Sequence, residues 1–442
     1  MSPLYLLLIL LVAILWMIAA GSYLKWHPFF SLLSATFGFG LLAALPPALL
    51  LDTMLQGFGA LIGSIGLIVI LGCILGVLLE DSGSVQQLGG ALALRATRYP
   101  SLALAFLGLL LGIPVFCDSG FIILFSLTKS MAVASGTPVP IMSLSLAGGL
   151  YSSHTLVPPT PGPVAAAATL GGTGSIGLVM LLGILVSIPV TLAAHLYARF
   201  AGQKLKLGDS LNRIEKAISG PATAWQAVFL ILFPVALIAA GSTVVLLQWD
   251  DPFSNTLSFL GKPVVALLMA VVLAMILFRR HGSLTSSIDK GLRQAGPIIL
   301  LTGCGGGFGA VLKASPLANG LAGLIHEQGL TGVGFLTGAF LLGVAFKTAQ
   351  GSTTSAMILV SALLSPLLSV SGLDSSSGHA LLVLTIGAGS MMVSHANDSY
   401  FWVVSQFNGF TLREGYLGIT LMTLVQGLTA FISVVILFLL IR

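Results

Sequence analysis

Charge is the property that this sequence lacks most. Asp, Glu, Lys and Arg make up only 7% of its 442 residues, whereas soluble domains carry about 25%. Hydrophobic residues account for 56%, and the mean hydropathy is +1.07. A soluble globule could not keep so much apolar surface out of water, so the composition excludes a soluble enzyme. Because a bilayer core offers the backbone no water, helices must satisfy their own hydrogen bonds, and we predict an all-α polytopic membrane protein.

Cysteines and cofactor-binding motifs are scarce as well. Cys73, Cys117 and Cys304 each stand in an apolar run, which indicates reduced core residues and not a disulfide or metal set. The glycine-rich run 303–309 follows no strand, so we interpret it as close helix packing and not as a dinucleotide site. No phosphate-binding loop is recognised. The sequence therefore predicts no cofactor, no metal and no enzymatic activity, and its net charge of +5, mainly in loops, requires no nucleic acid.

Long hydrophobic runs are abundant. Ten are candidate membrane spans: 4–20, 29–51, 57–79, 101–116, 176–200, 225–247, 263–278, 296–312, 332–346 and 415–441. Several are shorter than the ~20 residues that a crossing helix needs. The runs that end at 116 and 346 pass directly into stretches rich in Gly, Ser, Thr and Pro. We therefore predict broken or re-entrant helices in regions 117–174 and 347–408, buried in protein or beside an aqueous cavity.

Three blocks of the sequence occur twice, in the same order and about half a chain apart. The most distinctive block contains Ser153-His154 in one copy and Ser394-His395 in the other. The matched pairs are 71–76 with 302–309, 112–120 with 343–351, and 148–154 with 389–395. A duplicated fold with polar, glycine-rich interruptions at corresponding places is typical of secondary transporters.

Lysine and arginine predict how the two copies lie in the membrane. Segments 199–216 and 279–293 each hold several basic residues, which favours the cytoplasmic side. Counting spans outward from these segments gives the runs 57–79 and 296–312 opposite directions. The two copies are therefore expected to be inverted relative to each other.

We accordingly predict two inverted-topology repeats, residues 1–200 and 225–442, joined by a cytoplasmic linker at 201–224. Their broken helices should meet at mid-membrane, because two similar halves can exchange conformations around a shared site. The lipid bilayer is the expected surrounding of both halves. A monomer and a homodimer both fit this organisation.

Two of the 13 acidic residues fall inside the predicted broken regions, whereas the others fall in loops or at span ends. These two are Asp118 and Asp398. A charged group at membrane depth costs about 3 kcal/mol on insertion scales and usually faces a cavity. Each could therefore carry a coupled proton. The alternative for each is a structural role as a helix cap or a hydrogen-bonded carboxyl.

His154 and His395 occupy matched positions in the two copies. A histidine can bind a proton near neutral pH or hydrogen-bond a hydroxylated substrate, so both are alternative proton carriers. Symmetry preserves structure as readily as function, so a histidine that only shapes the helix break is an equal alternative.

Lys347 stands where the second copy breaks, directly before the polar run 348–354. We expect its ammonium, or the amino termini of half-helices, to neutralise a substrate carboxylate. Neighbouring hydroxyl and amide groups suit a polyhydroxylated ligand. The complete predicted substrate site is Ser119, Gly120, His154, Thr155, Lys347, Gln350, Ser352, Thr353, His395 and Asn397.

Four pieces of the sequence are specific enough to indicate a family. They are Phe116-Cys-Asp118-Ser-Gly120-Phe121, the run 153–163 with its Pro-Pro-Thr-Pro-Gly-Pro piece, 349–352 and 394–402. On these pieces the chain resembles the gluconate:proton symporters, the gluconate permease family of the ion-transporter superfamily. It departs from the usual family residues at Cys117, Thr160, Lys347 and Tyr400, where Phe, His, Arg and Gly are common.

The resemblance implies a secondary active transporter of the bacterial inner membrane. Such a carrier would import a small organic anion, gluconate or a related sugar acid, together with protons and by alternating access. Some family members carry D-serine, so another small polar acid is an alternative substrate. A sodium-coupled organic-anion carrier, a channel and an intramembrane enzyme are the remaining alternatives.

Overall fold

The computed structural model describes residues 3–85, 87–88, 99–171, 175–205, 223–246, 249, 251–279, 283–316, 331–395 and 398–441. Within these residues the regular structure is helical throughout and contains no strand. Seven of the described helices are long and apolar enough to cross a membrane, or eight if the bent pair 252–278 counts as one span. The predicted all-α, multi-span architecture is confirmed.

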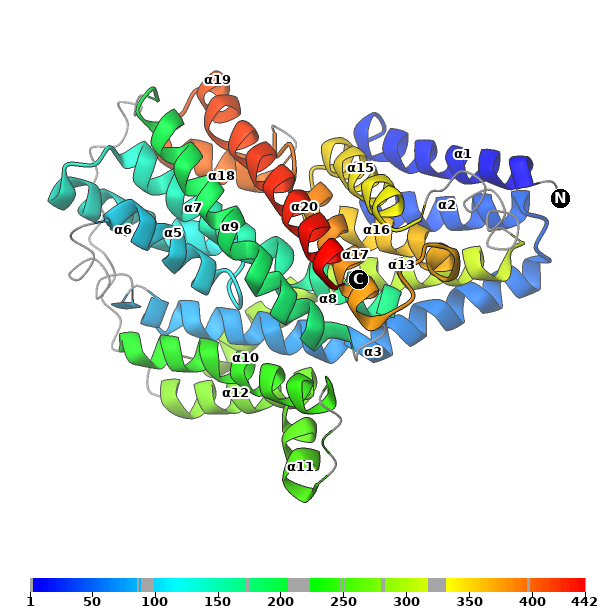
Figure 1. Cartoon of the computed structure of the whole chain (residues 1–442), viewed down its shortest axis with the longest axis horizontal. Helices are drawn as coiled ribbons and strands as arrows, with labels where there is room; N and C mark the ends of the chain where they lie inside the picture. Colours follow the sequence, from blue (N-terminus) through cyan, green and yellow to red (C-terminus); the bar gives the residue numbers. More distant parts are fainter. Residues whose placement is uncertain are drawn as a thin grey trace.

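The helices are numbered along the chain in Figure 1. In the first half they are α1 (Pro3–Ser22), α2 (Pro28–Leu42), α3 (Pro47–Asp81), α5 (Pro100–Leu111), α6 (Cys117–Ser135), α7 (Val139–Leu156), α8 (Pro161–Gly171) and α9 (Ile176–Gly202). In the second half they are α10 (Ala224–Leu246), α11 (Pro252–Leu260), α12 (Pro263–Phe278), α13 (Leu284–Ala314), α15 (Val333–Gln350), α16 (Thr353–Leu364), the 3-10 helix η3 (Ser365–Val370), α17 (Ser376–Met391), α18 (Ser399–Asn408), α19 (Leu412–Gly415), the π-helical turn η4 (Tyr416–Thr420) and α20 (Leu421–Ile441). Residues 206–222 of the predicted linker lie outside the described residues.

Proline determines where several of these helices begin. Its fixed φ suits the first turn, and its missing N–H is not needed there. The predicted span 29–51 is wrong as a single helix for this reason. The chain leaves α2 at Leu42, takes a positive φ of 55° at Ala44, and begins α3 at Pro47. The pair Pro46-Pro47 marks this break in the sequence, but the apolar composition of the run outweighed it in the prediction.

The two longest helices, α3 and α13, pack along each other (Figure 1). Glycines permit the close approach. A Cβ on Gly57 would lie 2.5 Å from the carbonyl oxygen of Gly306, and a Cβ on Gly306 would lie 2.5 Å from the carbonyl oxygen of Gly57. The glycine-rich run 303–309 therefore serves close helix packing, as predicted from the sequence.

The same helix contact occurs once in each half. Gly108 of α5 and Gly149 of α7 face each other, and a Cβ on Gly149 would lie 1.9 Å from a backbone oxygen of α5. Gly343 of α15 and Gly389 of α17 face each other likewise, with a Cβ on Gly389 2.2 Å from a backbone oxygen of α15. A close glycine contact of the same kind is thus present in both halves.

The structural register of this duplication differs from the sequence match. The match aligns Gly343 with Gly112, four residues after its structural counterpart, and Gly389 with Gly148, one residue before its counterpart. A shift of four residues is about one helical turn, so it keeps the same face of the helix and looks acceptable in sequence. The backbone contacts instead make Gly108 the counterpart of Gly343 and Gly149 the counterpart of Gly389.

We expect Gly149→Ala to lower the stability of the folded protein strongly. The new Cβ would meet the backbone of α5, which cannot rotate away as a side chain can, so the cost should reach or exceed the usual ~1–3 kcal/mol of overpacking. Thermal unfolding in detergent measures the change. Gly59→Ala in α3 is the control, because nothing lies within 4 Å of its Cβ position. An unchanged Tm for Gly149→Ala would contradict the close approach.

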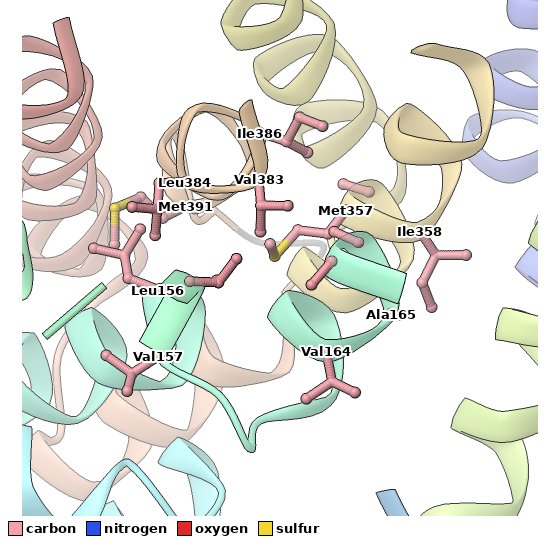
Figure 2. Packing of buried hydrophobic residues seen from close by; sticks show 14 of the residues in the cluster. Leu156, Val157, Val164, Ala165, Met357, Ile358, Val383, Leu384, Ile386 and Met391 are labelled. Carbon is pink, nitrogen blue, oxygen red and sulfur yellow. The ribbon is translucent and has the colours of Figure 1, made fainter. Parts of the chain in front are cut away.

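Helices break in both regions where the sequence predicts breaks. α7 ends at Leu156 and α8 begins at Pro161, after the peptide Pro158–Pro159, which is cis. In the second half α17 ends at Met391 and α18 begins at Ser399. The halves are not separate units, because α8 packs against α16 and α17, and α9 packs against α20. Figure 2 shows where α8 meets α16 and α17. Met357 of α16 lies there in one group with Leu156, Ala165 and Val383.

Candidate functional site

A cavity of about 420 Å³ lies where helices of both halves begin or end. Its wall comes from the ends of α2, α6, α7, α15, α16 and α18 and from the middle of α13. The lining residues are His27, Pro28, Phe116, Cys117, Asp118, Tyr151, His154, Pro297, Ile298, Leu301, Gln350, Gly351, Ser352, Thr353, Thr354, Ser355, Asp398, Ser399 and Tyr400. Six of the predicted site residues line it: Asp118, His154, Gln350, Ser352, Thr353 and Asp398.

Besides that of α2, three helix amino termini contribute to this wall. α16 begins after Ser352, whose hydroxyl accepts from the backbone N–H of Ser355 at 3.2 Å. α18 begins after Asp398, whose carboxylate accepts from the backbone N–H of Tyr400 at 3.1 Å. α6 begins at Cys117, with no side-chain cap on its first turn. Since the amino-terminal end of a helix carries partial positive charge on N–H groups that lack partners within the helix, these termini favour an anion in the cavity.

A buried ion pair lies in the wall of the cavity. The Lys347 ammonium is 2.6 Å from Asp398 Oδ2, and the side chains are only 1% and 8% exposed. The same ammonium donates to the carbonyl oxygen of Gly351 at 2.7 Å. The Ser394 hydroxyl also donates to Asp398 Oδ2. The carboxylate of Asp398 is therefore neutralised and hydrogen-bonded within the protein.

Asp118 has a different environment, although it lines the same cavity. Its Oδ2 accepts one long hydrogen bond, 3.3 Å, from the hydroxyl of Ser399. Its Oδ1 is buried, and none of the described residues gives it a hydrogen-bond partner. No ion pair of Asp118 occurs within the described part of the chain. This carboxyl has capacity to bind a proton or a ligand group that Asp398 lacks.

Other polar atoms at the cavity are unpartnered as well. His154 Nδ1 is buried without a hydrogen-bond partner among the described residues, and so are both amide atoms of Gln350. Buried polar groups in native proteins are almost always paired, so such groups need a functional explanation. Phe116 lies against the His154 ring, with 5.6 Å between ring centroids. Together these side chains offer hydrogen bonds beside an apolar surface.

Two stacked tyrosines form one side of the site. The rings of Tyr151 and Tyr400 are 5.2 Å apart at an interplanar angle of 14°. The Tyr151 hydroxyl is 2.8 Å from the hydroxyl of Thr353, and the Tyr400 hydroxyl donates to the carbonyl of Ala147 at 2.9 Å. Tyr400, one of the departures from the resembled family, thus joins the two halves of the fold. Sequence reasoning named neither tyrosine as a site residue.

Five of the predicted site residues, Ser119 among them, are described but lie outside the cavity lining. The Thr155 hydroxyl donates to the carbonyl of Tyr151 at 2.8 Å within α7. Gly120 packs against Leu150, and His395 Nε2 lies 3.0 Å from the carbonyl oxygen of Thr348. Lys347 is turned into the ion pair with Asp398 and is also absent from the lining.

The last two predicted site residues are Ser119 and Asn397. The Ser119 hydroxyl donates to the carbonyl of Phe116 at 3.3 Å, away from the cavity lining, and it also contacts the carboxylate of Glu80. The apolar pattern puts Glu80 at a span end, and the structure places it in the last turn of α3, partly buried. Asn397 lies outside the described residues.

Sequence reasoning missed His27, which lines the cavity from the amino terminus of α2. His27 is the N-cap of this helix and accepts from the backbone N–H of Phe29 at 3.2 Å. No neighbouring motif marks this histidine. By contrast, Tyr151 lies inside the repeated block 148–154, and this position could have been weighed with His154.

An all-helical membrane protein with a polar cavity at converging helix breaks is a membrane transport protein in its architecture. Comparison with known proteins agrees. The GntP family permease profile matches residues 5–441, so the chain belongs to the GntP permease family. It is therefore a permease and not an enzyme, and the family resemblance seen in the sequence is confirmed.

Curated relatives match over nearly the full length. The chain is 33% identical to the inner membrane permease YgbN of Escherichia coli K12, over 98% of both chains. It is 30% identical to a gluconate permease of Pseudomonas aeruginosa, over 98% of this chain and 97% of the relative. It is 28% identical to the D-serine transporter DsdX of Escherichia coli K12, over 97% of both.

Solved structures share the fold at low identity. The Alcanivorax borkumensis YdaH transporter superposes with a TM-score of 0.62 at 18% identity, over 89% of both chains. Neisseria gonorrhoeae MtrF, described as an antimetabolite efflux pump, superposes with a TM-score of 0.61 at 14% identity, over 88% of this chain and 83% of that one. These likenesses concern the architecture alone.

Proposed function

We propose that this permease imports a small hydroxylated carboxylate, gluconate or a related sugar acid, together with protons across a bacterial inner membrane. Relatives named gluconate permease, at 29–30% identity over 92–98% of the chain, support this substrate class. D-serine is the second candidate, because a D-serine transporter is a relative over 97% of the chain. Both molecules carry a carboxylate and a hydroxyl group.

The observation that carries the proposal is the convergence of three helix amino termini on one cavity. The termini of α6, α16 and α18 supply partial positive charge for a carboxylate. His154 and Gln350 supply hydrogen-bonding groups for hydroxyls, and none of the described residues occupies these groups. A cavity of about 420 Å³ lies within the range of ~300–1,000 Å³ that is usual for small-molecule sites.

Asp118 is the proposed carrier of the coupled proton. Asp398, the other candidate, is already neutralised by Lys347 and hydrogen-bonded on both carboxylate oxygens. Asp118 keeps one oxygen beside the proposed substrate without a hydrogen-bond partner in the described part of the chain. A proton on Asp118 would remove its repulsion of an incoming carboxylate, which couples proton binding to anion binding. The histidines at 154 and 395 remain alternative carriers.

Alternating access between two inverted repeats, 1–200 and 225–442, is the proposed transport mechanism. The matched contacts of α5 with α7 and of α15 with α17 support the duplication. The breaks that flank α8 and α18 support sites of conformational change. An inverted duplication would let each half adopt the conformation of the other and so open the cavity to either side in turn.

A substrate-panel uptake assay tests this function. Cells or vesicles that contain the protein should take up labelled gluconate or a related sugar acid, and a protonophore should stop accumulation. Replacement of sodium by choline should leave uptake unchanged. Preferential competition by D-serine would assign the second candidate instead. Uptake that requires sodium and ignores the protonophore would contradict the proposal.

We expect His154→Ala and Gln350→Ala each to weaken substrate binding. Each removes a hydrogen-bonding group that no described residue occupies, and such a loss is worth about 1–3 kcal/mol, or roughly a 5- to 150-fold rise in KM. Initial rates of uptake over a range of substrate concentrations measure the change.

The matched control for these two variants is Thr385→Val. The Thr385 hydroxyl is buried but bonds the carbonyl of Leu381 within its own helix, away from the cavity. Its KM should equal that of the wild type. If His154→Ala and Gln350→Ala also kept the wild-type KM, the cavity would not be the binding site.

A further inference from the structure

The ammonium of Lys347 occupies a position built to hold a cation. It contacts a carboxylate oxygen of Asp398 at 2.6 Å and the carbonyl oxygen of Gly351 at 2.7 Å. It lies 5.9 Å from the centroid of the Tyr151 ring, within cation–π distance. Its side chain is only 1% exposed. Two oxygens and an aromatic face therefore surround a positive charge deep in the fold.

The backbone around this ammonium adds to the negative potential. Lys347 belongs to the last turn of α15, and the carboxyl end of a helix carries partial negative charge. Gly351 ends α15 in the left-handed conformation, with φ of 78°, and its carbonyl lies in the break before α16. In carriers with broken helices, carbonyls at such breaks and the carboxyl ends of half-helices are the groups that coordinate sodium.

We propose that Lys347 is a tethered cation that occupies a monovalent-cation site between α15, α16 and α18, so that transport proceeds without sodium. The site consists of the Asp398 carboxylate, the Gly351 carbonyl and the carboxyl end of α15. Truncation of the lysine exposes these oxygens and creates a binding site for sodium. The lysine thus acts as a permanent internal counter-ion, and not as the partner of the substrate carboxylate.

The position of the site allows a small cation from the cavity to replace the ammonium. Gly351 and Asp398 contact the ammonium, the Tyr151 ring lies within cation–π distance of it, and all three residues also line the 420 Å³ cavity. A small cation that enters the cavity can therefore reach the oxygens once the lysine side chain is removed. The remaining bonds of Asp398, from the hydroxyl of Ser394 and the backbone N–H of Tyr400, hold the carboxylate in place.

Thermal unfolding of purified Lys347→Ala in detergent tests the proposal. The Tm is measured in sodium chloride, potassium chloride and choline chloride at equal ionic strength. We expect sodium to raise the Tm of this variant relative to choline, with a saturating dependence on concentration, because a ligand that binds the folded state stabilises it. The wild type should show no difference between the salts. Equal Tm values for Lys347→Ala in sodium and choline would overturn the proposal, as would a sodium response of the wild type.

Two further variants keep the test decisive. Lys347→Ala with Asp398→Asn removes the anionic ligand as well, so it should fold without a sodium response. Lys313→Ala removes an exposed lysine at the end of α13 and should respond to no particular salt. If Lys347→Ala is recovered only in sodium, the proposal is supported. If it fails to fold in every salt while the double variant folds, sodium cannot replace the ammonium and the proposal fails.

Transport supplies a second measurement, which rests on the proposed function. Uptake by Lys347→Ala should become dependent on sodium, whereas uptake by the wild type should be the same in sodium and choline. The unfolding experiment needs no substrate, so it stands if the substrate assignment is wrong. Conversely, a Lys347→Ala variant without a sodium response would leave the proposal of proton-coupled uptake by the wild type unaffected.

Discussion

Asp118→Asn is expected to abolish proton-driven accumulation of substrate while exchange of substrate across the membrane continues. Asparagine resembles a carboxyl that is permanently neutral, so the variant can bind the anion and change conformation but cannot release a proton. The buried Oδ1 of Asp118, which has no hydrogen-bond partner among the described residues and lies beside helix amino termini, motivates this expectation. In vesicles with an imposed pH gradient, internal substrate should rise no higher than the external concentration.

Asp374→Asn is the matched control for this prediction. Asp374 lies in the loop before α17 with its side chain 72% exposed, so the variant removes a carboxylate far less enclosed than that of Asp118. Its accumulation should equal that of the wild type. Normal accumulation by Asp118→Asn would show that this carboxyl does not couple transport, and the same experiment on His154→Ala and His395→Ala would then examine the alternative carriers.

Lys347→Met is expected to lower the stability of the folded protein severely. The substitution leaves the carboxylate of Asp398 buried and without its counter-ion, and breaking such a pair from one side costs about 3–5 kcal/mol. Thermal unfolding in choline chloride, where no sodium can compensate, measures this loss. The methionine keeps most of the volume of the lysine, so a cavity contributes little.

The double variant Lys347→Met with Asp398→Asn separates charge from packing. It removes both charges at once, and replacing both members of a buried pair is often nearly neutral for stability. Its Tm should therefore lie much closer to that of the wild type than the Tm of Lys347→Met does. Equal losses in the single and double variants would show that the ion pair is not what holds α15 and α18 together.

Composition and periodicity are sufficient to predict the class of fold. Apolar runs of membrane length, with little charge between them, leave only a helical bundle that spans the bilayer. The breaks after α7 and α17 are also predictable, because the run 157–163 and the block 389–395 combine Pro, Gly, Ser and His in otherwise apolar sequence. The break at Ala44 is marked in the sequence by Pro46-Pro47, but the apolar composition of the run 29–51 outweighed this signal in the prediction.

The candidate site is only partly predictable, because its main contacts join residues far apart in sequence. Lys347 and Asp398 are 51 positions apart, and Tyr151 and Thr353 are 202 apart. The sequence indicates that each of the charged residues is unusual at membrane depth, but a single sequence does not reveal which of them pair. Sequence reasoning therefore directs Lys347 toward the substrate, whereas the structure gives its charge to Asp398.

The most direct test of proton-coupled import is uptake by the purified protein in liposomes that contain no other transporter. With an acidic outside, a neutral inside and choline in place of sodium, labelled gluconate or the sugar acid preferred in the substrate panel should accumulate above its external concentration. A protonophore should collapse this accumulation. If substrate accumulates only when sodium is present, or only equilibrates whatever the pH gradient, the protein is not a proton-coupled carboxylate importer.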